Sequence, residues 1–234
     1  MLISCLVILV GCGREEIAAD LIPPEDVLLT VRSADTSLVE EGIDAVPGGH
    51  YIYLSWLASP ADDLAGYRVF RQTQDSADFD MVDEVDAFIT EYEDHDPILA
   101  PNQITGLTLG FSYWVVAFDE AGNVSNLSDE ATYRLMPTPV LSPPVVQGDS
   151  LVFSWSYNQY DPLDFSFYVI RLFQQQGSDW IPIWIYVHNV PFPLEAAYYS
   201  VFLSAGTYKY QVDVVGAPLD LPAGSEADLE FAFP

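Results

Sequence analysis

Hydrophobic and polar residues alternate in short runs along most of the chain from residue 23 onward. Residues 51–56 (YIYLSW) and 180–188 (WIPIWIYVH) are examples, and Gly, Pro, Asn and Asp residues separate such runs. A period of two is typical of a strand with one buried face, whereas an amphipathic helix repeats every three to four residues. Because no long stretch follows the helical period, the sequence predicts an all-β fold.

Several of these runs recur about 100 residues later, which indicates two similar domains. The pairs are residues 51–56 with 151–155, 67–71 with 167–171, and 107–115 with 203–212. A period of this size predicts a tandem of small domains, at residues 23–136 and 145–234. The residues between them, 137–144 (PTPVLSPP), predict a stiff, extended linker and therefore a rod-like pair.

The repeated residues resemble the fibronectin type III family, whose members are immunoglobulin-like β-sandwiches. The family has a buried tryptophan on its second strand, which Trp56 and Trp155 match. Its third strand has an aromatic-x-Val-x-Arg pattern, found as Tyr67, Val69, Arg71 and as Phe167, Val169, Arg171. The resemblance implies two tandem sandwiches with a tryptophan in each core, and a role in adhesion, spacing or protein contact rather than catalysis.

In this family the sixth strand follows a Leu-x-x-Gly-x-x-Tyr corner, which Leu107, Gly110 and Tyr113 match. The resemblance implies that the tyrosine hydroxyl is bonded back to backbone. The second copy of the corner is shorter, so that either Tyr208 or Tyr210 is its tyrosine.

Two loops of the first domain also stand out. Residues 119–123 (DEAGN) predict a tight hairpin, with an Asx turn at Asp119 and positive φ tolerated at Gly122 and Asn123. Residues 35–49 form a long loop between the first and second strands, and this loop departs from the family pattern.

The N-terminus carries an apolar run, residues 2–10, that ends at Gly11 and Cys12. The run is too short to span a bilayer and has the length of a secretory signal core. Residues 9–12 (LVGC) resemble the lipobox of bacterial lipoproteins, although no Lys or Arg precedes the run. The resemblance implies a signal peptide at 1–11 and a lipid on Cys12.

The same resemblance implies an acidic tether at residues 12–22 and attachment to the bacterial cell envelope. Gly13, rather than Asp, follows the cysteine, which favours the outer membrane or the cell surface over retention at the inner membrane. Cys5 would leave with the signal, so no disulfide is expected to assist the fold.

The net charge and the absence of known catalytic motifs restrict the classes of function that the sequence allows. The chain has 35 Asp and Glu against 7 Lys and Arg, a net charge of −28, which argues against nucleic acid as a partner because phosphate binding needs cations. The sequence has no Gly-x-Ser-x-Gly, His-Glu-x-x-His or phosphate-cradling glycine loop, so we expect no catalytic residues. No cofactor is expected, with calcium as the exception to test.

The calcium hypothesis rests on the acidic run at residues 91–96, with Asp94 and Asp96 as first candidate ligands. The run lacks the spacing and the glycine of an EF-hand. The alternative interpretation is a solvated acidic edge that discourages strand-to-strand aggregation.

A ligand surface is predicted around residues 180–188. The odd positions of this run are Ile or Val, which suits a core face and would place Trp180, Trp184 and Tyr186 on the outer face. Tyr168 and Lys209 on neighbouring strands would join them. Aromatic rings with polar neighbours can stack on sugars or receive a protein. The alternative is that this stripe is covered or belongs to the core.

The sequence therefore predicts a non-enzymatic, lipid-anchored interaction or adhesion module of the cell envelope, with an envelope protein or a polysaccharide as partner. Two alternatives remain open. One is a glycan-binding accessory lipoprotein of a polysaccharide uptake system, and the other is a structural spacer without a ligand.

Overall fold

The computed structural model describes residues 20–77, 79–101, 109–157, 165–189, 196–199, 203–216 and 222–234, with backbone alone at 196–199. Predictions for the signal peptide, for Cys12 and for Leu107 lie outside these ranges. Within them, no helix is both long and apolar enough to cross a membrane.

The first half of the chain forms a sandwich of two sheets. Its strands are β1 (Asp44–Val46), β2 (Tyr51–Ser55), β3 (Leu64–Thr73), β4 (Phe79–Asp86), β5 (Glu91–Asp94), β6 (Gly110–Asp119) and β7 (Ala131–Leu135), with a 3₁₀ helix, η1 (Pro97–Leu99), after β5. One sheet has the order β1-β2-β5, and the facing strands run β7-β6-β3-β4.

The second half repeats this arrangement strand for strand. Its strands are β8 (Val140–Gln147), β9 (Ser150–Ser156), β10 (Phe165–Gln176), β11 (Asp179–His188), β12 (Ala196–Tyr199), β13 (Gly206–Gly216) and β14 (Ala223–Phe233). The orders are β12-β9-β8 and β11-β10-β13-β14. The predicted class, two tandem immunoglobulin-like β-sandwiches, is confirmed.

Each half has its own hydrophobic core with a tryptophan in it. Trp56 and Trp155 are both 3% exposed, and each meets a tyrosine of the opposite sheet edge-on. The ring centroids lie 5.3 Å apart for Trp56 and Tyr67, and 5.1 Å apart for Trp155 and Tyr168. The predicted burial of both tryptophans is therefore confirmed.

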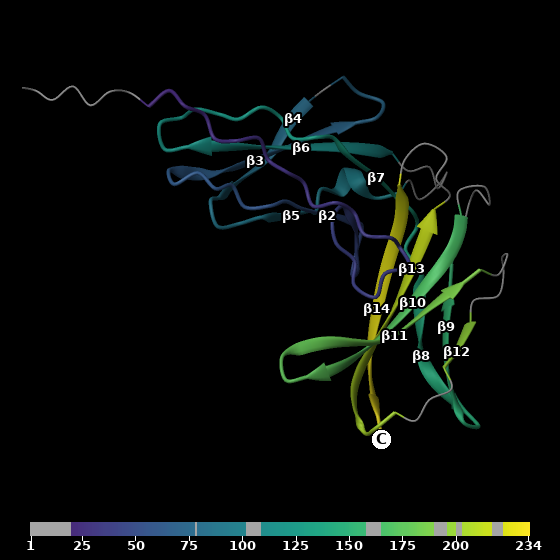
Figure 1. Cartoon of the computed structure of the whole chain (residues 1–234). Coiled ribbons are helices and arrows are strands. Elements are labelled where there is room, and N and C mark those ends of the chain that lie inside the picture. Colours follow the sequence, from purple (N-terminus) through teal and green to yellow (C-terminus); the bar gives the residue numbers. More distant parts are fainter. Residues whose placement is uncertain are drawn as a thin grey trace, which may run out of the picture.

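The two halves do not form a rod. β7 and β14 pair in parallel, so the larger sheets of the two sandwiches join into a single eight-stranded sheet. Figure 1 shows the first half lying crosswise to the long strands of the second. The segment expected as a linker is also shorter, because β8 starts at Val140 and contains Pro143 and Pro144. The prolines thus lie in an edge strand, where a missing backbone donor is tolerated.

Close backbone approach makes this joint possible. The amide of Met136 donates to the carbonyl of Gly224 at 2.7 Å, and the Ser225 hydroxyl donates to the carbonyl of Pro137 at 2.6 Å. A Cβ atom at Gly224 would lie 2.5 Å from the Tyr133 hydroxyl, so only glycine fits there.

The third strands of the two halves differ in register by one residue. In the first half Tyr67 and Val69 point into the core, but in the second half Tyr168, Ile170 and Leu172 do so. Residues that match by letter between 67–71 and 167–171 therefore point to opposite faces of their sheets. A slip of one residue sends side chains to the opposite face, and it places Arg171 outside its own core.

The corner tyrosines also differ from expectation. The Tyr113 hydroxyl donates to the Asp94 side chain at 2.8 Å rather than to backbone. In the second half Tyr208 donates to the backbone carbonyl of Ser204 at 2.8 Å, so Tyr208 is the corner residue. Tyr210 instead donates to the Ser142 carbonyl across the sandwich, at 2.6 Å.

The predicted hairpin after β6 is present. Asp119 accepts a 2.8 Å hydrogen bond from the Asn123 amide, and Gly122 has a φ of +91°. Asn123 does not take positive φ, because every described residue with positive φ is a glycine.

Candidate functional site

Asp94 and Asp96, the candidate calcium ligands, are occupied by an arginine. Arg71 on β3 donates to Asp94 Oδ2 at 2.6 Å and to Asp96 Oδ2 at 2.7 Å. Asp94 also accepts from Tyr113, and Asp96 caps η1 by accepting from the Ile98 amide. This arrangement holds β5 and η1 against β3 and β6, which is a structural role. It gives no support to a calcium site at this pair.

The predicted aromatic ligand surface is divided between two faces of the sheet. Tyr168 is 2% exposed within the second core, and Trp184 packs against that core, with its ring centroid 6.1 Å from Phe153. Tyr186 stacks on Trp184 and is 43% exposed. These three residues share the inner face, which corrects the outer position predicted for them.

Trp180 and Lys209 lie on the opposite, outer face. The Lys209 ammonium sits 5.2 Å from the Trp180 ring centroid and 5.3 Å from that of Phe173, and it pairs with Asp228 at 3.3 Å. Trp180 lies on a different face from Trp184 because β11 carries a bulge between them. Opposite this bulge, Leu172 pairs with Trp184 but Phe173 pairs with Pro182. The bulge reverses the alternation along β11.

These positions change what mutation of the stripe should do. We expect the Trp184→Ala/Tyr186→Ala double variant to lose about 3 kcal/mol of unfolding free energy, because Trp184 fills space beside Phe153. Trp180→Ala, on the outer face, is the matched control and should leave the melting temperature nearly unchanged. Thermal melts monitored by near-UV circular dichroism measure both. Equal melting of the double variant and the wild type would show that Trp184 is not a core residue.

A second group of polar side chains meets where the two halves join. Arg171, on the outer face of β10, is 1% exposed. Its Nε donates to the carbonyl of Ser37 at 3.0 Å, and its Nη2 donates to the carbonyl of Asp35 at 2.6 Å and to Glu40 Oε1 at 2.5 Å. A side chain of the second half thereby binds the 35–40 segment of the first half.

Two carboxyl groups of the second half flank the same arginine. Asp213 Oδ2 lies 3.6 Å from Arg171 Nη1, and Glu226 Oε1 lies 3.9 Å from it. Both acids are buried, and neither of these oxygens accepts a hydrogen bond from the described residues.

The first half adds a buried network of its own. Asp44 Oδ1 accepts from the Tyr133 hydroxyl at 2.7 Å, from the Ala45 amide at 2.8 Å and from Arg32 Nη2 at 3.4 Å. Arg32 also pairs with Asp35 and donates from Nε to the carbonyl of Ile43 at 3.0 Å. These bonds fold residues 32–45 into a fixed strap along the joint.

Burial makes the charges of this junction costly. It raises the pKa of Glu40 to about 10, and the negative charges of Asp213 and Asp44 add to that shift while Arg171 opposes it. Burial likewise raises the pKa of Asp213 and of Glu226 well above the ordinary values. The junction thus favours protons or another cation on these carboxyl groups.

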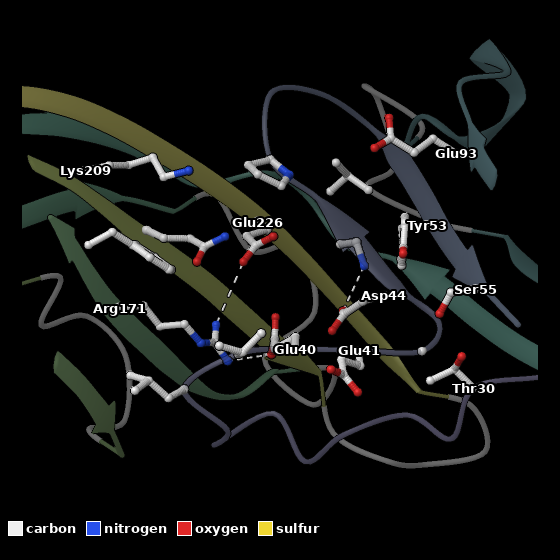
Figure 2. Close-up of a pocket in the computed structure, with 18 of the residues that line it drawn as sticks. Thr30, Glu40, Glu41, Asp44, Tyr53, Ser55, Glu93, Arg171, Lys209 and Glu226 are labelled. Carbon is white, nitrogen blue, oxygen red and sulfur yellow. Dashed lines mark hydrogen bonds and ion pairs between the residues drawn. The ribbon is translucent and has the colours of Figure 1, made fainter. Parts of the chain in front are cut away.

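A cleft of about 640 Å³ opens beside this network. Figure 2 shows Glu226, Glu40, Glu41 and Asp44 along its middle, Arg171 and Lys209 toward one end, and Tyr53, Ser55 and Glu93 at the other. The apolar part of the cleft wall is formed by Leu38, Val39, Leu57 and Phe173. A concave, mostly preformed site with a few polar groups is the usual form of a binding site.

Sequence reasoning did not find this junction, although two signals pointed to it. The first was the 35–49 loop, which departed from the family pattern; it contains β1 and the residues that bind Arg171. The second was Arg171 itself, assigned by its letters to the same position as Arg71. The sheet face on which Arg171 lies depends on the register of β10, which the amino-acid sequence does not reveal.

No protein-family model matches the chain, and no curated protein matches it. Many solved structures are similar to part of the chain, and two of them serve as examples. The Clostridium perfringens spore cortex lytic enzyme SleM is 23% identical, with a TM-score of 0.31 over 49% of this chain and 29% of its own. The FN1–FN3 domains of chicken CNTN1 are 12% identical, with a TM-score of 0.33 over 88% of this chain and 67% of theirs. At these TM-scores neither likeness bears on function.

Proposed function

We propose that this chain is a non-enzymatic interaction module of the bacterial cell envelope, anchored by a lipid on Cys12, whose two sandwiches act as one rigid body. Its partner is an envelope protein with a basic surface, which binds at the open end of the junction cleft.

The observation that carries this proposal is the buried junction. A flexible tandem would leave its domain interface polar and wet, and relative motion would be the default. Here a continuous sheet crosses the interface, and the buried Arg171 donates to acceptors of the first half and forms ion pairs with Asp213 and Glu226 of the second. Such a joint keeps the shape of the cleft constant, which lowers the ordering cost of binding.

The charge of the cleft favours a protein over a neutral glycan. Glu41 and Glu93 are exposed at its walls, and the whole chain carries a net charge of −28. Acidic surfaces accelerate association with basic partners and select against acidic ones. The aromatic rings of Phe173 and Trp180, next to Lys209, are the kind of surface that suits sugar stacking.

Site-specific photo-crosslinking in cells tests the partner. A crosslinking residue at position 41 should give a protein adduct, and the same residue at Glu130, an exposed acid away from the cleft, should not. The Glu41→Lys/Glu93→Lys double variant should abolish the adduct, while Asp129→Lys/Glu130→Lys should not. Binding of the purified chain to a polysaccharide panel without any adduct would favour the glycan alternative, and neither result would favour the spacer.

The lipid anchor has its own expected result. The wild-type chain should fractionate with membranes, and its intact mass should show cleavage before Cys12 with acyl groups attached. Cys12→Ser should remove the acceptor sulfur and shift the protein to the soluble fraction. Cys5→Ser is the matched control and should leave the fractionation unchanged. An unmodified cysteine in membrane-purified protein would contradict the anchor.

A further inference from the structure

We propose that the free edge of β4 is a second binding surface, at which an extended, basic segment of a partner protein adds to the sheet as a further strand. This inference goes beyond the proposed function, because no residue of β4 is among those that line the junction cleft. The binding needs only β4 and its neighbours β3 and β6, which belong to the first half.

The edge itself is open. β4 is the last strand of the eight-stranded sheet, and in the described part of the chain only β3 pairs with it. An edge strand presents unpaired backbone N–H and C=O groups on its free side, and an extended peptide can pair with them. Six of the eight residues of β4 are exposed, so the edge is accessible to a partner.

An apolar shelf, formed by Phe70, Phe79, Met81 and Trp114, lies on the outer face of the sheet beside this edge. Phe79 is 41% exposed and Met81 is 53% exposed. The Phe79 ring stacks on Phe70 of β3, with 5.0 Å between the ring centroids, and its centroid lies 5.2 Å from that of Trp114 on β6. These contacts hold the ring in place before a partner arrives, which lowers the ordering cost of binding. Aromatic residues held in this way are typical anchors of protein interfaces.

Acids lie on the other side of the same edge. Asp80 and Asp83 are exposed, and they pair with Arg71 and Val69 of β3, whose side chains point inward. Because alternate residues of a strand face opposite sides, an added strand would meet the apolar shelf with one set of side chains and these acids with the other. Apolar pairs and pairs of opposite charge both stabilise a ladder. A segment in which apolar residues alternate with Lys or Arg therefore fits this edge.

The charge of β4 selects against a second copy of this chain. Four of its eight residues are acidic and none is basic. Two β4 strands paired with each other would bring acids opposite acids, which is destabilising. β11, at the other edge of the sheet, has one acid in ten residues and contains Pro182, which lacks a backbone donor. Of the two edges, β4 is the one that suits a basic strand.

A model strand tests the edge. The probe is a fluorescein-labelled nine-residue peptide in which Lys alternates with Val, long enough to cover β4. It is titrated against the detergent-purified full-length chain at 0.15 M salt, which screens attraction beyond about 8 Å, and is followed by fluorescence anisotropy. We expect saturable binding of one peptide per chain.

Two altered peptides separate strand pairing from general attraction to an acidic protein. The same sequence with every internal amide N-methylated keeps its charges but has no backbone donors, so its affinity should fall about tenfold or more. A peptide in which Glu alternates with Val keeps the backbone donors but reverses the charge, and it should not bind. Equal binding of the methylated peptide would overturn the inference.

Amide hydrogen exchange locates the peptide on the wild-type chain. Exchange should slow in residues 79–86 when the peptide is bound, because its backbone covers the free edge. It should not change in residues 179–188, the strand at the opposite edge of the sheet. Protection at β11, β1 or β5 without protection at β4 would overturn the inference.

Variants test the charge of the edge. Asp80→Lys/Asp83→Lys should weaken binding of the Lys-Val peptide about tenfold or more, because it turns attraction into repulsion at two exposed positions. If this variant fails to fold, Met81→Lys places a like charge on an exposed part of the shelf and should also weaken binding. Asp129→Lys/Glu130→Lys is the matched control, since it makes the same change of charge at two exposed acids outside β4 and should leave the affinity within about twofold. Binding by the Asp80→Lys/Asp83→Lys variant equal to that of the control would overturn the inference.

The remaining outcomes separate this surface from the junction cleft and from self-association. Glu41→Lys/Glu93→Lys should bind the peptide as the control does, and a loss of binding there would place the peptide in the cleft and overturn this inference. Self-association of the chain that the peptide reverses would make a second copy the occupant and would also overturn it. The crosslinked protein adduct at position 41 is measured independently, so either result can fail while the other stands.

Discussion

Arg171→Ala is expected to lower the free energy of unfolding by about 3–5 kcal/mol and to release the strap between the two sandwiches. The substitution removes three hydrogen bonds, those to the carbonyls of Asp35 and Ser37 and to Glu40. It also leaves the buried carboxyl groups of Asp213 and Glu226 without their guanidinium partner, and a buried charge that loses its partner costs more than a lost bond between exposed groups. Urea unfolding measures the loss.

The loss of stability in Arg171→Ala should be confined to the junction between the two halves. Amide hydrogen exchange should accelerate in residues 35–44 and at the β7–β14 pairing, since both depend on the enclosed arginine. The Trp56 core of the first sandwich should retain its protection.

Arg68→Ala is the matched control for this prediction. Arg68 lies on β3, the counterpart of β10, and its ion pair with Glu84 is exposed to solvent. Exposed ion pairs contribute about 0–1 kcal/mol, so this variant should unfold nearly as the wild type does. Equal stability of Arg171→Ala and Arg68→Ala would show that the junction does not hold the two halves together.

Trp56→Ala and Trp155→Ala are each expected to cost about 3–5 kcal/mol, because they remove a large core side chain and leave a cavity. Both rings are 3% exposed and contact a buried tyrosine of the facing sheet. Each change should act first on its own half, because the two cores are separate clusters. Thermal melts with tryptophan-specific near-UV signals follow the two halves.

Phe88→Ala is the control for the tryptophan variants. Phe88 is also a large aromatic residue but is 79% exposed, so its loss should change stability by no more than about 0.5 kcal/mol. A shift of only one or two degrees for Trp56→Ala would contradict its assignment to the core.

Alternation, turn residues and the internal repeat were sufficient to predict the class of fold from sequence. Residues 51–56 place Ile52, Leu54 and Trp56 on one face by period two, and all three are buried. The Asx turn at Asp119 follows in the same way, because its hydrogen bond joins residues four apart in the chain. Such features depend on local chemistry and on the simple geometry of a strand.

Only the tertiary structure decided which alternate residues of each strand point into the core. Residues 67–71 and 167–171 have matching letters, yet opposite members of the two sets point inward. A bulge on β11 in turn sends Trp180 and Trp184 to different faces. One residue of slip or one extra residue reverses every later side chain, and the energy that selects the register comes from packing against distant strands.

The candidate site depended on the tertiary structure even more strongly. Arg171 meets Asp35 and Glu40 across more than 130 residues of sequence, and no local pattern relates them. The composition alone established that the chain has few cations and many acids. Which acids are buried together, and so bind a proton or an arginine, followed from the parallel pairing of β7 with β14, because that pairing closes the two sandwiches around the strap.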